Sequence, residues 1–211
     1  MDPISLIRRR WLGALTAGLG GLVGQPVLAA LAPTPRQTPG PFYPETLPLD
    51  RDNDLTRVDG RDGRAQGEYT ELGGRVVDAR GRPLAGVQVE IWQCNAFGRY
   101  HHPRDNRGVS LDPYFQGYGS FTTGADGGYR FRTIKPVHYP GRTPHIHFAL
   151  SGPGVRAFTT QLYVAGEPAN ERDFVLNSIR DPQARKRLIV PFEAGRDTPW
   201  RAHFELVAER V

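Results

Sequence analysis

The sequence predicts an all-β protein, a β-sandwich with short helices in its connections. The 211 residues include 25 glycines and 19 prolines, a composition that favours many turns and short strands over long helices. From residue 71 onward, short segments of alternating apolar and polar residues are separated by turn signals, as in a sandwich. The length suits one domain with a sizeable core, preceded by a tail.

The expected elements follow one another at short intervals. We expect strands over residues 74–78, 87–92, 120–123, 129–134, 145–150, 158–164 and 200–207. A long loop over residues 95–119 separates the second strand from the third. The third and fourth strands flank a glycine-rich turn at residues 125–128 and are expected to form a hairpin. Residues 170–179 and 182–189 are expected to be short helices, the second opened by Asp181-Pro182.

Residues 1–30 have the pattern of an export signal rather than of a folded element. The pair Arg8-Arg9 precedes an apolar run over residues 13–23, and small residues near its end suit a cleavage site. This order resembles a twin-arginine signal, although Ile7 replaces the Ser or Thr that usually precedes the pair. We therefore expect a periplasmic or extracellular protein with no membrane attachment after removal of the signal. A Sec-type signal or an uncleaved anchor is the alternative.

Residues 31–70 are expected to form an irregular N-terminal arm on the β-sandwich domain of residues 71–211. The arm contains TPGPFY at residues 38–43, whose Phe42 and Tyr43 are candidate anchors. Basic residues are scattered and the net charge is only +5, so nucleic acid is not an expected partner. The single cysteine excludes an internal disulfide and is expected to be a small buried residue rather than a nucleophile.

The residues that suggest chemistry lie between positions 100 and 147. His145 and His147 stand two apart on an expected strand, so both imidazoles point to the same face and can hold one metal ion. Tyr100 and Tyr139 add two phenolic oxygens. Phenolate is a hard, charged ligand that favours iron(III) over zinc or copper(I), and a bound cation removes the phenol proton. A common strand HxH pair and ordinary buried tyrosines are the alternative.

These residues belong to a larger run that resembles a known family. GGYRFRTIKPVHYPGRTPHIHF, with NAFGRY upstream and FTTQLYVAGEP downstream, resembles the intradiol ring-cleavage dioxygenases and, among them, the β-chain type of protocatechuate 3,4-dioxygenase. The resemblance covers roughly residues 73–167, and residues 38–43 resemble the GPFY arm of the family. It implies a non-haem Fe(III) ion, with water or hydroxide as a fifth ligand, held by Tyr100, Tyr139, His145 and His147.

The resemblance also implies roles in catalysis. Tyr139 would be the axial ligand that leaves when substrate binds and accepts a substrate proton. Arg142 would stand beside the reacting ring and stabilise negative charge there, and Gln161 would support the site. The implied reaction cleaves a catechol-type ring between its two hydroxyl-bearing carbons with O2, and it gives a cis,cis-muconate-type diacid.

Several features depart from the family, and they leave the substrate and assembly open. Protocatechuate enzymes use two different chains, whereas catechol 1,2-dioxygenases carry a helical linker that is not visible here. The segment over residues 140–144 is short, which leaves the substituent on the catechol open. A homo-oligomer and a partner chain are both compatible with the sequence. A non-catalytic exported β-sandwich binding module and a dioxygenase that binds catechols without cleaving them are the alternative functions.

Overall fold

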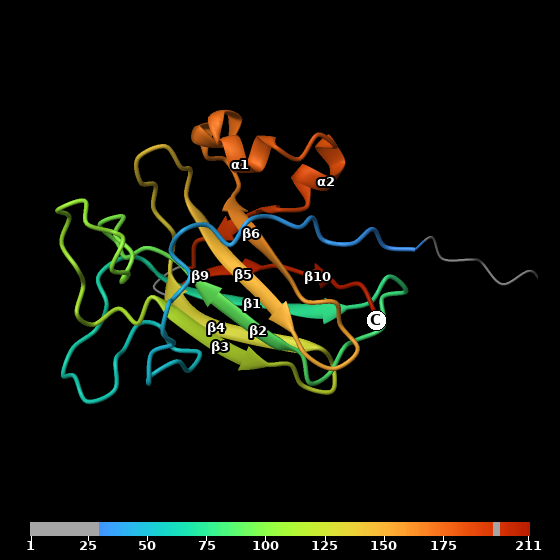
Figure 1. Cartoon of the computed structure of the whole chain (residues 1–211), viewed down its shortest axis with the longest axis horizontal. Helices are drawn as coiled ribbons and strands as arrows, with labels where there is room; N and C mark the ends of the chain where they lie inside the picture. The colour runs from blue at the N-terminus through green and yellow to red at the C-terminus, as the bar shows by residue number, and fades with distance from the viewer. Residues whose placement is uncertain (1–29, 196–198) are drawn as a thin grey trace, which may run out of the picture.

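The fold is a sandwich of two five-stranded sheets, as predicted (Figure 1). The computed structural model describes residues 30–195 and 199–211, so the predicted export signal lies outside the described residues except for Ala30. One sheet contains β1 (Tyr69–Val77), β4 (Gly128–Ile134), β8 (Phe192–Glu193), β9 (Trp200–His203) and β10 (Leu206–Val207). The other contains β2 (Gln88–Trp92), β3 (Tyr118–Thr122), β5 (His145–Ser151), β6 (Phe158–Val164) and β7 (Ile189–Val190).

The predicted hairpin of the third and fourth strands is wrong. β3 pairs with β2 and β4 pairs with β1, so the two strands belong to different sheets. The turn between them, closed by a 3.2 Å hydrogen bond from the Gly124 amide to the Gly128 carbonyl, passes from one sheet to the other. The alternation within each strand is the same in both arrangements, so the sequence pattern does not identify the partner. β1 provides β4 with a pairing that runs from Tyr69–Ile134 to Arg75–Gly128.

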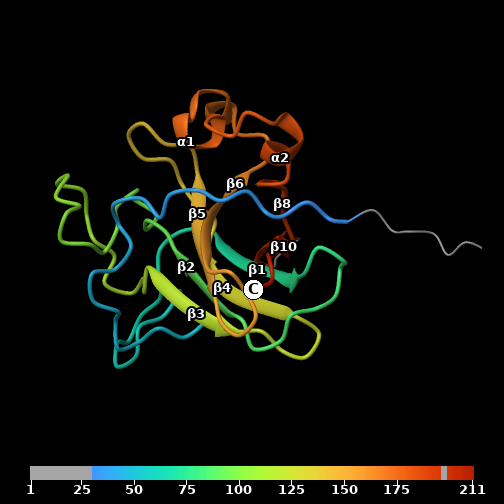
Figure 2. The same ribbon diagram turned by 45° about the vertical axis from the view of Figure 1, so that its right-hand side comes forward.

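The helical segments are shorter than predicted and lie at one end of the sandwich, beyond β6 (Figure 2). They are the 3-10 helix η1 (Pro168–Arg172), α1 (Phe174–Asn177) and α2 (Pro182–Lys186). Asp173 has an extended backbone and interrupts the helix predicted over residues 170–179. The second predicted helix ends at Lys186, and Ile189 already belongs to β7. No helix in the described residues is long and apolar enough to cross a membrane.

β5 is buried on both faces, and this decides where the site lies. Ile146, Phe148 and Leu150 are at most 1% exposed and pack into the core between the sheets, as predicted. The opposite face carries His145 and His147, which are each 1% exposed. A strand buried on both faces needs a second cover, and the N-terminal arm contributes to it.

The arm, over residues 30–68, contains no helix or strand, and its first part runs alongside β6 (Figures 1 and 2). Backbone hydrogen bonds hold it along its length, from the Thr34 amide to the Val207 carbonyl and from the Gln37 amide to the Thr159 carbonyl. Because β1 begins at Tyr69, the border expected between residues 70 and 71 falls inside that strand. The arm therefore contacts both sheets, and its segment around Gln37 lies against the sheet that carries the two histidines.

Candidate metal centre and active site

The four predicted metal ligands come together on the outer face of β5. The ring centroids of His145 and His147 are 4.9 Å apart, and Tyr139 lies 5.5 Å from His145. Tyr100 lies 5.7 Å from Tyr139 and 6.2 Å from His147. The histidines share a strand face, whereas the tyrosines come from two loops. One site therefore receives two imidazoles and two phenols.

Local hydrogen bonds shape the two loops that carry the tyrosines. The Arg142 amide donates to the Tyr139 carbonyl at 2.9 Å, which closes a tight turn beside β5. The Tyr100 amide donates to Asp105 Oδ2 at 2.8 Å, and Asp105 in turn binds Arg107. The Arg107 guanidinium lies 4.9 Å from the centre of the Tyr139 ring. The two loops are thus connected through a cation–π contact at Tyr139.

Several ligand-candidate atoms are buried without a hydrogen-bond partner. They include Tyr100 Oη, His145 Nε2 and His147 Nδ1. His145 Nδ1 lies 2.6 Å from the Thr143 carbonyl, which assigns the proton to Nδ1 and leaves a lone pair on Nε2. A buried polar atom with no partner costs about 1–3 kcal/mol. A metal ion would satisfy Tyr100 Oη and His145 Nε2, so the donors fit the ion that the family resemblance implies.

The electrostatics also suit metal binding. Burial and the charge of Arg142 lower the pKa of His145 to about 3, and burial, His145 and Arg142 lower the pKa of His147 well below its usual value. Both imidazoles are therefore neutral and able to bind a cation. Burial raises the pKa of Tyr100 and of Tyr139, so loss of either phenol proton requires a nearby cation. In the described part of the chain, no three His, Cys, Asp or Glu side chains form a metal-binding group.

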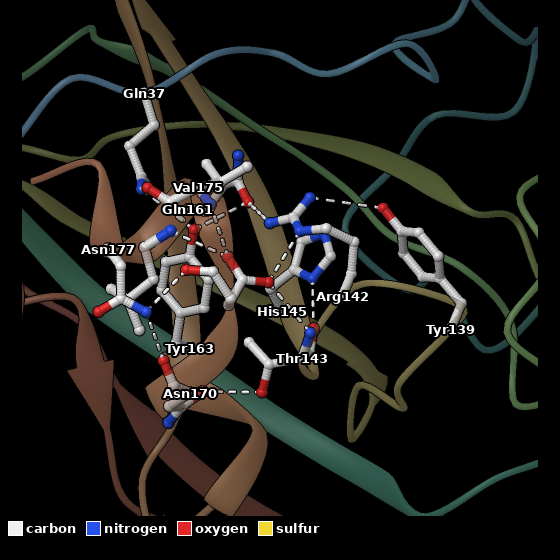
Figure 3. A network of polar contacts seen from close by, with 12 residues as sticks. Gln37, Tyr139, Arg142, Thr143, His145, Gln161, Tyr163, Asn170, Val175 and Asn177 are labelled. Carbon is white, nitrogen blue, oxygen red and sulfur yellow. Dashed lines mark hydrogen bonds and ion pairs between the residues drawn. The ribbon is translucent and has the colours of Figure 1, made fainter.

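Arg142 lies at the edge of this group, and three side chains surround its guanidinium (Figure 3). Nη2 donates to Gln161 Oε1 at 2.6 Å, and Nη1 is 3.5 Å from Tyr139 Oη. Nε donates to Asp173 Oδ2 at 2.8 Å, in an ion pair whose side chains are 8% and 0% exposed. Burial alone raises the pKa of Asp173, but hydrogen bonds from Arg142 and from the Leu176 amide outweigh it and lower this pKa. The structure therefore places both Arg142 and Gln161 beside the candidate ligands.

Gln161 connects Arg142 to the arm. It lies across from His147 in the pairing of β5 with β6. Its Oε1 accepts a hydrogen bond from the Tyr163 hydroxyl at 3.1 Å, and its Nε2 donates to the Thr38 carbonyl at 3.1 Å. Gln161 is 0% exposed, and all its polar atoms are paired. The amide is therefore fixed with its oxygen toward the guanidinium.

Sequence reasoning missed the aromatic cover of the ligands. Trp92 stacks on His147 at 4.8 Å with an interplanar angle of 9°, and Phe42 stacks on Tyr100 at 4.7 Å. Gly40 is so near His147 that an added Cβ would lie 3.2 Å from its Cε1. The sequence predicts Phe42 only as an anchor of the arm, and it predicts for Trp92 only a place in the strand over residues 87–92. Their roles depend on strand pairing and arm position, which local pattern does not give.

A cavity of about 640 Å³ lies beside Tyr100, between Phe42, Trp92 and His102. This volume falls in the range of about 300–1,000 Å³ that small-molecule sites occupy. His102 is buried and its Nε2 lies 3.9 Å from Glu45, whereas His101 and His138 are exposed. The cavity gives the candidate site a compartment next to one of its tyrosines.

Comparison with known proteins identifies the class. A family model described as "Dioxygenase" (Dioxygenase_C) matches residues 38–207. The chain therefore belongs to this dioxygenase family, within which its relatives are intradiol ring-cleavage enzymes.

The particular relatives support the sequence-based prediction of family and enzyme class. The protocatechuate 3,4-dioxygenase beta chain of Burkholderia cepacia is 42% identical over 161 residues, covering 72% of this chain and 67% of that one. Catechol 1,2-dioxygenase of Candida albicans is 34% identical over 138 residues, covering 57% of this chain and 42% of that one. The dioxygenase domain of a dioxygenase carbohydrate-binding fusion from Streptomyces sp. SirexAA-E superposes with a TM-score of 0.66 at 30% identity, covering 85% of this chain and 100% of that one. This chain thus spans less than half of the Candida enzyme and all of the Streptomyces domain.

Proposed function

We propose that this protein is a non-haem iron(III) intradiol dioxygenase. It would cleave a catechol-type ring between the two hydroxyl-bearing carbons with O2 and release a cis,cis-muconate-type diacid. The observation that carries the proposal is the meeting of two tyrosines and two neutral histidines, with buried Tyr100 Oη and His145 Nε2 left unpaired. Family membership supports the same reaction class.

Tyr100, Tyr139, His145 and His147 would hold the iron. When bound, iron(III) withdraws electron density from a catecholate ring and makes it reactive toward O2. Tyr100 is 2% exposed and is covered by Phe42, whereas Tyr139 is only partly buried and its hydroxyl lies 3.5 Å from Arg142 Nη1. We therefore assign Tyr139 as the ligand that leaves and accepts a substrate proton at Oη.

Arg142 would stabilise negative charge on the bound substrate. Its guanidinium is held by Gln161 and Asp173 in one orientation, with Nη1 toward Tyr139. A fixed charge in a buried site stabilises developing negative charge more strongly than a mobile one in water, because it needs no reorganisation during the reaction. Phe42 and Trp92 cover the ligands and reduce the access of water to them.

The visible spectrum and iron content of the purified protein test this proposal. We expect about one iron per chain and a red-brown tyrosinate-to-iron(III) band that shifts when catechols bind, with O2 uptake. Tyr139→Phe should change the colour and slow turnover, because it removes both the ligand and the proton acceptor. A colourless protein that cannot be loaded with iron(III) contradicts the proposal. An unchanged spectrum and rate in Tyr139→Phe contradicts the assignment of the leaving ligand.

We also propose export and a small catechol-type substrate outside the cytoplasm. The support for export is the Arg8-Arg9 pattern and the apolar run that follows it. Cell fractionation of the tagged protein tests this, with Arg8→Lys and Arg9→Lys together as the twin-arginine variant. Retention of wild type in the cytoplasm contradicts export. Unchanged export of the double variant contradicts the twin-arginine route.

The assembly is proposed to be a homo-oligomer or a complex with a partner chain. The support is the relationship to the protocatechuate 3,4-dioxygenase beta chain, because a beta chain is by name one of at least two chains. Light scattering of the purified protein distinguishes a homo-oligomer from a monomer. A monomer with full activity contradicts the proposal.

A further inference from the structure

Asp173 uses both carboxylate oxygens, and each oxygen has a separate task. Oδ1 accepts the amides of Val175 and Leu176 at 3.0 and 2.9 Å, which caps the start of α1. Oδ2 accepts Arg142 Nε at 2.8 Å and the Thr143 amide at 3.1 Å. The side chain is 0% exposed. A helix cap needs only Oδ1, so the second oxygen is available for the site.

The second oxygen controls two parts of the candidate site. Through Nε it fixes the Arg142 side chain, whose Nη1 faces Tyr139 and whose Nη2 faces Gln161. Through the Thr143 amide it fixes the peptide segment whose carbonyl lies 2.6 Å from His145 Nδ1.

A second contact reaches the same short helix from the arm. Gln37 Nε2 is 3.1 Å from the Val175 carbonyl and 3.1 Å from the Tyr163 hydroxyl, and Tyr163 donates to Gln161 (Figure 3). The first turn of α1 is therefore tied to both sides of the guanidinium. Both partners of the Arg142 guanidinium, Asp173 and Gln161, are thus anchored by further hydrogen bonds to α1 and to the arm.

We propose that Asp173 is a positioning residue for ring cleavage, acting by holding the Arg142 guanidinium against Tyr139 and Gln161. This inference rests on the proposed function and adds a residue that does not touch the substrate or the metal. Misplacement of a catalytic group by about 1 Å can cost on the order of 10²-fold in rate. Loss of Oδ2 should therefore lower kcat rather than substrate affinity.

Asp173→Asn separates the two tasks of the carboxylate. Asparagine is as good a helix cap as aspartate, so Oδ1 can still accept the α1 amides. Its Nδ2 is a donor, and it would face the two donors Arg142 Nε and Thr143 N. Asp181→Asn is the matched control, because Asp181 caps α2 by accepting the Gln183 amide at 2.9 Å.

The kinetic test compares these variants as iron-loaded full-length proteins. We expect Asp173→Asn to lower kcat by about 10²-fold, with KM within about threefold and iron content equal to wild type. Asp181→Asn should keep the wild-type kcat. In an Arg142→Met background, Asp173→Asn should cause no further loss, because its effect passes through Arg142. A kcat within twofold of Asp181→Asn, or an equal loss in both backgrounds, overturns the proposal.

A second readout needs neither metal nor turnover. The Arg142 Nε–H signal in the ¹H–¹⁵N spectrum of the metal-free protein, identified by its loss in Arg142→Met, should exchange slowly with water. Asp173→Asn should speed this exchange at least about tenfold, because a charge-assisted hydrogen bond is lost. If Asp173→Asn does not fold, Asp173→Ser keeps a good cap and removes the pair.

The kinetic and exchange measurements distinguish failure of the Asp173 proposal from failure of the proposed function. Unchanged Nε–H exchange in the folded variant, or fast exchange in wild type, overturns the hold of Asp173 on Arg142. A wild type that neither binds iron nor turns over refutes the proposed function and the catalytic part of this inference. In that case the exchange measurement still decides whether Asp173 holds Arg142.

Discussion

Gly40→Ala is expected to weaken metal binding by more than its effect on folding explains. Gly40 has φ +69°, and an added Cβ would lie 3.2 Å from His147 Cε1 and 3.7 Å from Nε2. A left-handed conformation costs a non-glycine residue about 1–2 kcal/mol. For a chain of this size, that cost lowers Tm by roughly 2–8 °C. The tight contact also moves the His147 ring or the arm by a few tenths of an ångström.

Displacement of a ligand by its supporting residue typically costs about 10–100-fold in metal affinity. Gly154→Ala is the matched control, because Gly154 has φ +68° and its added Cβ meets nothing within 4 Å. Both variants should lose similar Tm in the metal-free state, whereas only Gly40→Ala should lose iron affinity. The assays are thermal unfolding followed by circular dichroism and competition for iron(III) with a chelator. Equal iron affinity in the two variants refutes the role of the Gly40–His147 contact.

Three further predictions concern burial, pH and the aromatic cover. Burial raises the pKa of Cys94 to about 12. Thiol labelling at pH 8 should therefore be at least about 10³-fold slower in the folded chain than after denaturation. Equal labelling rates contradict this prediction. Although burial opposes it, hydrogen bonds from Arg82 lower the pKa of Asp78 from 3.8 to about 2. Because that pKa is depressed, Asp78→Asn should reduce Tm most above pH 4, and this loss should shrink as the pH falls through 2. A pH-independent difference contradicts the linkage. Phe42→Ala should lower the free energy of unfolding by about 0.5–1.5 kcal/mol through the lost stacking on Tyr100, and further through lost burial. An unchanged Tm contradicts this prediction.

Local pattern predicts the strands and the shared direction of His145 and His147, because side-chain alternation is a property of one segment. It does not predict which strands pair, and the expected hairpin of β3 and β4 fails for that reason. Trp92 covers His147 only because β2 and β5 pair with these two residues opposite each other. Asp173 lies 31 residues from Arg142, and the sequence pattern places it inside the helix expected over residues 170–179, where nothing indicates a cap or a contact with Arg142. These contacts depend on strand register and on long-range packing, and local sequence patterns contain no information about either.

The origin of each candidate ligand supports the roles assigned to them. His145 and His147 belong to a central strand whose other face fills the core, so moving either imidazole would disturb β5 and both of its neighbours. A one-residue slip of that strand would exchange its two faces and displace the core residues. The positions of the histidines are therefore fixed by the strand register. Tyr139 instead stands in a short turn and is partly buried, with Arg107 and Arg142 beside its ring and hydroxyl. Its side chain can rotate without breaking the strand ladder, and a released tyrosinate would still meet positive charge. Of the four proposed donors, Tyr139 therefore suits the role of the leaving ligand that we propose for it.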